Sequence, residues 1–478
     1  MTQVRQWRAS AGGFAAALLG LLAACGGSEE RPRDVILITI DTLRADHLGL
    51  YGYPRPTSPR IDEWFGTGRI FERSYSAEAR TAPSVASILS GRHPQDHGIR
   101  LFYQLAPPGL ELIPDLLPAS YQTAAFVSNI VLTDEAMGIA DHFDHYDDFV
   151  SQRESKRAIF ERNAERTNAA VLEWMNTERD PGRPLFLWVH YIDPHGPYRA
   201  PADWPVTFEP QGQRPIERER IARYMIEPGV KNGYEYVDAY DEEITYVDEH
   251  VGRLLDELAQ RLPVDDSLVV LTSDHGETMM EHERWFSHGF NVYEGIMRVP
   301  LLVRGPGGVP GRVEHLVSGI DVAPTILAFA GADVPAGWEG VDLLSGAGLD
   351  AERIVFAEAA SKDKQWRTAI HGDRKVRLTV TGERVVSEEV EYDLGRDPGE
   401  VAGGTLTESA SELVQGILAR VASDPDPAGV PAQYEKGTKL EDAKVDPRAD
   451  DAALEGLRAL GYVDDGFESE DEPEAHEH

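Results

Sequence analysis

Two carboxylates and a histidine stand where buried strands are predicted to end, and these residue types suit a bound metal ion. Residues 35–40 form a nearly continuous apolar, β-branched run that stops at Asp41. Far downstream, residues 268–272 repeat this pattern shortly before Asp274 and His275. In open α/β sheets, ligands bind just beyond the carboxyl ends of the strands. We therefore expect Asp41, Asp274 and His275 to hold a divalent cation.

A threonine near the start of a predicted helix is the candidate that could act on an anion. Pro83 suits a first helical turn, where its missing N–H costs nothing, so residues 83–89 are predicted to be helical with Thr81 just ahead of them. A helix N-terminus offers unpaired N–H groups and a positive dipole, which favour phosphate or sulfate. Taken by itself, this segment favours the simpler interpretation that Thr81 caps the helix.

Alternating strands and helices must position these residues. From residue 34 to about residue 344 the alternation predicts an α/β fold, with a mainly parallel sheet covered by helices on both faces. The further strands are predicted at residues 124–127, 185–190 and 301–303, and the further helices at residues 156–176, 236–261 and 322–330. Residues 374–380 and 384–386 flank a turn and predict a hairpin, which indicates a small C-terminal α+β subdomain with an antiparallel sheet.

Composition limits the class of partner. The chain has 478 residues, of which 41% are hydrophobic, and a formal net charge of −36. Binding to nucleic acid depends on neutralising phosphates with Lys and Arg, so no nucleic-acid partner is expected. We interpret the acidity as serving solubility. The sequence does not predict the oligomeric state.

The first residues have the pattern of an export signal. Arg5 and Arg8 precede an apolar run at residues 14–22 that is too short to span a bilayer well. The run ends in Leu-Ala-Ala-Cys25 and resembles a bacterial lipobox, which implies cleavage before Cys25 and lipidation of its thiol. The chain would then be exported and anchored by lipid to a bacterial membrane, facing the periplasm. The alternative is an ordinary signal peptide with an incidental cysteine.

These observations divide the chain into six predicted segments. They are a lipoprotein signal peptide at residues 1–24, a tether at 25–33, a catalytic domain at 34–348, a small subdomain at 349–425, an extension with a terminal helix at 426–463 and an acidic, disordered tail at 464–478.

Together with the sequence motifs around them, the candidate residues resemble the sulfatase branch of the alkaline phosphatase superfamily. The matching motifs include DTLRADHLG at Asp41, PS through SGR at Pro83, HYIDPHGPY at His190 and SDHGE at Ser273. These motifs follow the order of the family over nearly the whole mature chain. The resemblance implies an alkaline-phosphatase-like fold and metal-dependent hydrolysis of an ester.

The departures from the family pattern bear on the chemistry. The resemblance implies a Cys or Ser at position 81, which sulfatases convert to formylglycine, and Thr81 cannot undergo that conversion. Val85 stands where the family has Arg, Thr42 where it often has a second Asp, and His288 where a lysine often contacts sulfate. Thr81 and His275 instead resemble phosphodiesterases, phosphonate hydrolases and headgroup phosphotransferases, in which a metal-bound Thr alkoxide is the nucleophile.

The resemblance also assigns roles to the remaining polar residues. Thr81 would be nucleophile and metal ligand, and His195 and His288 would act on the substrate or leaving group. Arg92 and His190 would bind the substrate. Structural roles remain as alternatives for His190 and His195, and a surface ion pair for Arg92. The imidazole of His275 favours Zn²⁺ or Mn²⁺ over Ca²⁺, and His195 could help to hold a second metal.

The leading hypothesis is an exported, metal-dependent hydrolase that cleaves a phosphate mono- or diester through Thr81 and a covalent intermediate. One alternative is a transferase that passes a phospho-headgroup to an acceptor by the same chemistry. Another is an arylsulfatase-like sulfuric ester hydrolase. The last is a non-catalytic binding protein on the same fold. Glu277, Glu281, His282 and Glu283 are interpreted as the solvated face of a mobile loop.

Overall fold

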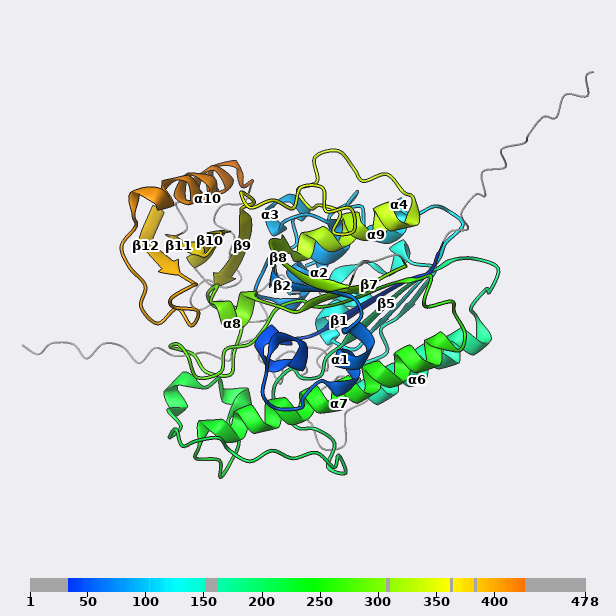
Figure 1. Cartoon of the computed structure of the whole chain (residues 1–478), viewed down its shortest axis with the longest axis horizontal. Coiled ribbons are helices and arrows are strands. Elements are labelled where there is room, and N and C mark those ends of the chain that lie inside the picture. The colour runs from blue at the N-terminus through cyan, green and yellow to red at the C-terminus, as the bar shows by residue number, and fades with distance from the viewer. Residues whose placement is uncertain are drawn as a thin grey trace, which may run out of the picture. The chain divides into compact units, whose positions relative to one another are not determined.

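The computed structural model describes residues 33–102, 104–150, 162–306, 310–361, 364–381 and 385–425 (Figure 1). The predicted signal peptide, Cys25, nearly all of the tether, the C-terminal extension and the acidic tail lie outside these ranges. Within them, no helix combines the length and the apolar character that crossing a membrane requires.

A large, mainly parallel sheet carries the candidate residues. Its eight strands run in the order β4-β3-β5-β1-β6-β7-β2-β8, and only β7 pairs antiparallel with its neighbours. The bounds are β1 Val35–Ile40, β2 Arg69–Tyr75, β3 Gln122–Val127, β4 His145–Asp147, β5 Leu185–Tyr191, β6 Leu268–Ser273, β7 Leu301–Arg304 and β8 Gly311–Ser318.

Helices cover both faces of this sheet (Figure 1). One layer contains α2 Thr81–Ser90, α4 Ile113–Leu116 and α9 Val322–Ala330, and the other contains α1 Pro59–Phe65, α6 Ala164–Thr177 and α7 Gly233–Ala259. Val35 and Leu37 of β1 pack in the first layer, while Ile36 and Ile38 pack in the second. Successive side chains of a strand point to opposite faces, so a strand covered on both sides needs an almost continuous apolar sequence.

A second sheet lies in the C-terminal part. Its four antiparallel strands, in the order β12-β11-β10-β9, are β9 Val355–Ser361, β10 Lys364–His371, β11 Arg374–Thr381 and β12 Val385–Asp393. Helix α10, Ser411–Ser423, packs on one face through Leu413, Ile417 and Val421. Short helices complete the fold: α3 Pro94–His97, α5 Asp134–Met137 and α8 Glu294–Met297. The predicted fold class, with a mainly parallel sheet and a small antiparallel one, is confirmed.

Several predicted boundaries need correction. Helix α2 begins at Thr81, so this residue is in the first helical turn and not ahead of it. Helix α6 begins at Ala164, after an Asn163 side chain that accepts a hydrogen bond from the N–H of Arg166; of the helix predicted at residues 156–176, residues 156–161 lie outside the described residues. Helix α7 begins at Gly233, because Asn232 and Glu235 form a reciprocal capping box there.

Candidate active site

The two carboxylates meet because their strands are neighbours. Strands β1 and β6 pair in parallel, and their register ends with Ile40 opposite Ser273. The next residue on each strand is therefore Asp41 or Asp274, at the same edge of the sheet. Both side chains are fully buried. This geometry brings together two residues that are far apart in the sequence.

Each carboxylate keeps one oxygen without a protein donor. Asp274 Oδ1 accepts the N–H of Thr42 at 3.2 Å and the N–H of His275 at 2.9 Å. Asp41 Oδ2 accepts the side-chain amide of Asn129 at 2.6 Å. Among the described residues, Asp41 Oδ1 and Asp274 Oδ2 have no hydrogen-bond partner. Because a buried carboxylate oxygen without a partner is costly, these two oxygens fit a cation.

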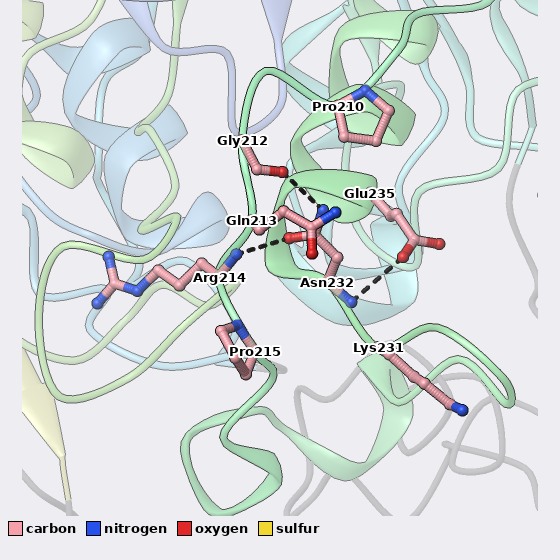
Figure 2. A pocket seen from close by; sticks show the side chains of 8 residues that line it. All are labelled: Pro210, Gly212, Gln213, Arg214, Pro215, Lys231, Asn232 and Glu235. Atoms are coloured by element: carbon pink, nitrogen blue, oxygen red, sulfur yellow. Dashed lines mark hydrogen bonds between the residues drawn. The ribbon is translucent and has the colours of Figure 1, made fainter.

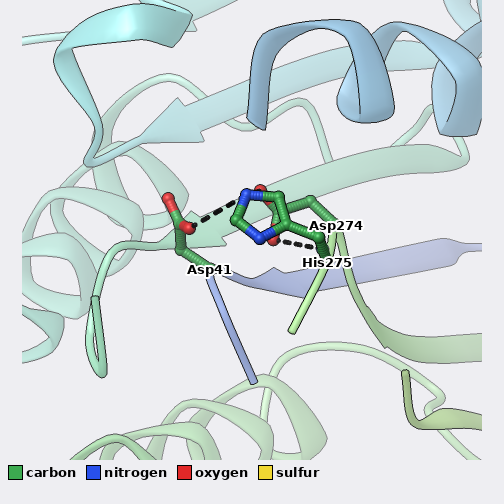
Figure 3. Close-up of side chains that lie close together, drawn as sticks. All are labelled: Asp41, Asp274 and His275. Atoms are coloured by element: carbon green, nitrogen blue, oxygen red, sulfur yellow. Dashed lines mark hydrogen bonds and ion pairs between the residues drawn. The ribbon is translucent and has the colours of Figure 1, made fainter. Parts of the chain in front are cut away.

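The imidazole of His275 completes this cluster (Figure 3). Its Nδ1 donates to the carbonyl of Gly276 at 2.9 Å, which leaves Nε2 as the nitrogen able to coordinate. That Nε2 lies 3.4 Å from Asp274 Oδ2 and 3.9 Å from Asp41 Oδ1. One ligand atom from each of the three residues lies within 4.8 Å of the others. Two carboxylates and an imidazole are a donor set that suits Zn²⁺ or Mn²⁺.

The hydroxyl of Thr81 faces this cluster. Thr81 Oγ1 lies 3.3 Å from His275 Nε2, and the Thr81 side chain is fully buried. The N-cap of α2 is Arg80, whose side chain makes no capping hydrogen bond, so the interpretation of Thr81 as a helix cap does not hold. A hydroxyl at the first turn of a helix and beside a metal-type cluster has the surroundings that a nucleophile needs.

The turn after β1 is strained, and neighbouring side chains hold it. Thr42 has φ 55°, a left-handed conformation that β-branched residues rarely adopt. The Tyr240 hydroxyl donates to the carbonyl of Thr42 at 2.7 Å and accepts the N–H of Arg44 at 3.0 Å. Ser273 Oγ accepts the N–H of Leu43 at 3.0 Å. This turn aims the Thr42 N–H at Asp274, and so helps to orient a candidate ligand.

Burial and mutual repulsion shape the electrostatics of the two carboxylates. Burial opposes the charged form of Asp41, yet the neighbouring His190, His195 and His275 lower the pKa of its carboxyl well below the usual value. Burial and the charge of Asp41 raise the pKa of Asp274 to about 7. A divalent cation between them would offset this repulsion and keep both carboxylates ionised.

Three further histidines surround the cluster. The His190 Nδ1 lies 2.8 Å from the Thr39 hydroxyl, and its Nε2 lies 3.5 Å from Asp41 Oδ2. The ring centre of His288 lies 4.5 Å from that of His275 and 5.0 Å from that of His195. Burial lowers the pKa of His195, and it lowers the pKa of His288 to about 4. His190 therefore lies beside the candidate ligand Asp41, and His195 and His288 form a second layer beside His275.

One predicted site residue lies away from the cluster. Arg92 follows Gly91, the residue that ends α2, and the ten-residue helix separates it from Thr81 by about 15 Å. The cation nearest in sequence to Thr81 is Arg80, which is buried and donates to the carbonyl of Ala360 in β9. Arg80 also lies close to Gly289, the residue after His288. If Gly289 carried a Cβ atom, that atom would lie 3.1 Å from Nε of Arg80. Sequence reasoning missed Arg80, although it directly precedes Thr81.

Sequence reasoning also missed Asn129 and misjudged Glu277. Asn129 orients Asp41, and it follows β3 at the same edge of the sheet, so its position after a predicted strand was the available signal. Glu277 was interpreted as part of a solvated loop, but its side chain is fully buried and lies beside His288. Burial raises the pKa of its carboxyl to about 7. Because Glu277 lies in a stretch rich in charged residues, composition alone does not indicate that its side chain is buried.

A hollow of about 460 Å³ lies elsewhere, between residues 210–215 and the start of α7 (Figure 2). Its polar groups largely satisfy one another: Asn232 donates to the carbonyl of Gly212 at 2.9 Å and accepts the N–H of Arg214 at 2.9 Å. Figure 2 shows the charged ends of Arg214 and Lys231 pointing away from these groups. None of the cluster residues lines this hollow.

A family model described as Sulfatase matches residues 33–332, which include every residue of the cluster. The chain belongs to the sulfatase family. An arylsulfatase of Clostridium perfringens is 25% identical over 465 residues, which cover 80% of this chain and 92% of that protein. The sulfatase-family assignment and the eight-stranded sheet identify the chain as a hydrolase of this superfamily.

Solved structures share the fold at lower identity. One, the structure of BT4656 in complex with its substrate D-glucosamine-2-N,6-O-disulfate, has a TM-score of 0.68 at 20% identity, and the match covers 83% of this chain and 99% of that one. Another, phosphonate monoester hydrolase SpPMH from Silicibacter pomeroyi, has a TM-score of 0.66 at 20% identity, and the match covers 83% of this chain and 96% of that one. The fold is therefore shared by a protein that binds a disulfated sugar as substrate and by a phosphonate monoester hydrolase.

Proposed function

We propose that this sulfatase-family chain hydrolyses a phosphate mono- or diester with the Thr81 hydroxyl as nucleophile. The observation that carries the proposal is the position of Thr81 Oγ1, 3.3 Å from His275 Nε2, beside two carboxylate oxygens without protein donors. A hydroxyl in this place is suited to attack an anionic ester that binds at the first turn of α2.

The reaction has two displacements. The Thr81 hydroxyl loses its proton and its oxygen attacks the phosphorus; the bond from phosphorus to the leaving oxygen breaks, the leaving oxygen takes up a proton, and Thr81 carries the phosphoryl group as a phosphothreonine. Water then loses a proton and attacks the same phosphorus, the bond from phosphorus to the Thr81 oxygen breaks, that oxygen recovers a proton, and phosphate or a phosphomonoester departs. When bound by Asp41, Asp274 and His275, a divalent cation supplies a lowered pKa for the hydroxyl and a counter-charge for the phosphoryl oxygens.

The residues around the cluster support these steps. The α2 N-terminus presents backbone N–H groups to the anion, and buried Arg80 adds positive charge on the side of His288 and Gly289. His195 and His288 are the imidazoles placed to exchange protons with the leaving oxygen and with water. Burial excludes bulk water from the cluster, which strengthens each of these interactions.

The choice of phosphorus over sulfur rests on the nucleophile. Sulfatases use a formylglycine made from Cys or Ser, and Thr81 would yield no such aldehyde. The arylsulfatase relative favours sulfate, so sulfate esters belong in the test. Our proposal gives more weight to Thr81, because the attacking group determines which covalent intermediate can form and be opened.

A substrate panel tests the proposal. Purified protein with Zn²⁺ or Mn²⁺ is assayed on an aryl phosphate, a bis-aryl phosphodiester, an aryl phosphonate and an aryl sulfate, with Thr81→Ala as control. We expect turnover of a phosphoryl substrate that Thr81→Ala loses while still binding the metal. Sulfate release as the main activity would contradict the proposal. An alcohol added as acceptor distinguishes hydrolysis from transfer, and protein that binds no divalent cation would favour a non-catalytic role.

We further propose that the chain is exported and anchored by lipid at Cys25. Support comes from three features of the sequence: the positively charged residues Arg5 and Arg8, the apolar run at residues 14–22 and the Leu-Ala-Ala-Cys25 motif. All three lie outside the described residues. Labelling with a radioactive fatty acid in a bacterial host should modify the chain and spare Cys25→Ser. Equal labelling of both would refute the anchor.

A further inference from the structure

Glu277 and His288 face each other across a short antiparallel pairing. Thr278 and Ser287 form an antiparallel bridge, in which the Thr278 N–H and hydroxyl both donate to the carbonyl of Ser287, at 3.0 and 2.7 Å. Antiparallel register places the next residues, Glu277 and His288, directly opposite each other. The His288 Nδ1 lies 3.4 Å from each carboxylate oxygen of Glu277.

The backbone of Glu277 is fixed on both sides. Its N–H donates to the carbonyl of Gly295 at 3.0 Å, and its own carbonyl accepts Nη1 of Arg44 at 2.9 Å. Arg44 belongs to the turn that follows β1 and Asp41, so the same turn supports both the metal-type cluster and Glu277. The Glu277 side chain is fully buried, and its conformation is therefore restricted by packing.

We propose that Glu277 is a positioning residue that sets the ring orientation and the tautomer of His288. With the carboxylate facing Nδ1, the proton of the neutral ring is held on Nδ1, and Nε2 becomes the nitrogen that exchanges protons in the reaction. Carboxylate partners fix the tautomer of metal-ligating histidines in this way, and losing one typically costs about 10–100-fold in metal affinity or activity; we expect an effect of the same size on His288. The catalytic consequence depends on the proposed function, whereas the tautomer does not.

A double-mutant cycle tests whether Glu277 acts through His288. Glu277→Ala, His288→Ala and the double variant are compared on whichever ester the wild type turns over. We expect Glu277→Ala to lower kcat by about 10–100-fold with little change in KM. The double variant should be no slower than His288→Ala alone. Losses that multiply in the double variant would overturn the proposal, because Glu277 would then act independently of His288.

A matched control and a metal measurement separate the competing roles. Glu283→Ala removes an exposed carboxylate from the same loop, and we expect it to leave kcat, KM and metal content unchanged. Glu277→Ala should bind as many metal ions per chain as the wild type. A lower metal content would identify Glu277 as a metal ligand and overturn the positioning role.

Nitrogen NMR of Zn²⁺-loaded protein with ¹⁵N-labelled histidine measures the tautomer directly. The ring signals of His288 are assigned by their absence in His288→Ala. At pH 8 we expect a protonated Nδ1 in the wild type and in Glu283→Ala, and a mixture of tautomers in Glu277→Ala. Unchanged His288 signals in Glu277→Ala would overturn the proposal. This measurement needs no substrate, so it remains decisive even if no ester of the panel is turned over.

Discussion

Replacing Asp274 with Asn should make the metal-free protein more stable than the metal-free wild type, and the metal-bound protein less stable than the metal-bound wild type. The change is nearly isosteric, because the amide oxygen can take the place of Oδ1 and accept the N–H groups of Thr42 and His275. The amide NH₂ then takes the place of Oδ2, the oxygen that has no protein partner. The variant therefore loses one negative charge and one candidate metal ligand, and keeps the hydrogen bonds that hold the side chain.

The expected magnitude follows from the distance between the charges. One carboxylate oxygen of Asp41 and one of Asp274 lie within 4.8 Å of each other. With an effective dielectric constant of about 20, two full charges at that separation repel by roughly 3 kcal/mol. Without metal at pH 8, above the pKa of about 7 for Asp274, the Asn variant should be more stable than the wild type by about 1–3 kcal/mol.

Metal should reverse this difference. A cation present at about a thousand times its Kd stabilises the wild type by about 4 kcal/mol, and the variant with one ligand fewer by much less. Urea unfolding at pH 8, with chelator or with Zn²⁺, measures both cases. Asp248→Asn is the control for the effect of metal, because Asp248 is also buried and accepts two backbone N–H groups, at Arg60 and Ile61, outside the cluster; Zn²⁺ should stabilise this variant as much as the wild type. The reasoning fails if Asp274→Asn is less stable than the wild type in chelator, or if Zn²⁺ stabilises both equally.

Two other perturbations give separate checks. Burial raises the pKa of Asp248 from 3.8 to about 7, so its protonated form favours the folded state, and the stability present below pH 4 is lost as the pH rises through 7. Asp248→Asn should therefore gain roughly 2 kcal/mol relative to the wild type between pH 5 and pH 8 in urea unfolding, and an unchanged difference would contradict this. Arg80→Met should raise the inhibition constant of inorganic phosphate about 10- to 100-fold, since a charged hydrogen bond contributes about 1.5–3 kcal/mol; an unchanged constant would exclude Arg80 from anion binding.

The core of the candidate site could be predicted because it depends on strand ends. Asp41 and Asp274 each follow a buried apolar run, and parallel strands end at one edge of a sheet, so proximity followed from the pattern. The large sheet and its helical layers followed from the same alternation. The central strands β1, β5 and β6 have the strongest apolar runs because both of their faces are covered.

Residues that depend on tertiary packing could not be predicted in this way. Strand β8 is an edge strand of the large sheet and β2 is the strand next to it, and the partly exposed positions of both give no continuous apolar signal. Glu277 lies among charged residues, and only the pairing of Thr278 with Ser287 buries it beside His288. Arg92 carried a favourable charge, but the length of α2 separates it from Thr81, and Arg80 occupies the nearer position.

The covalent intermediate at Thr81 is the most direct test of the proposed chemistry. The metal-loaded protein is mixed with an aryl phosphate substrate, quenched in acid within the first turnover, digested and analysed by mass spectrometry. We predict a phosphoryl group on Thr81 in the peptide that spans the start of α2. In the Thr81→Ser variant, we expect the phosphoryl group on the serine that replaces the threonine. A substrate that is hydrolysed without any modified residue 81, or a sulfated Thr81 formed from an aryl sulfate at a higher rate, would contradict the account.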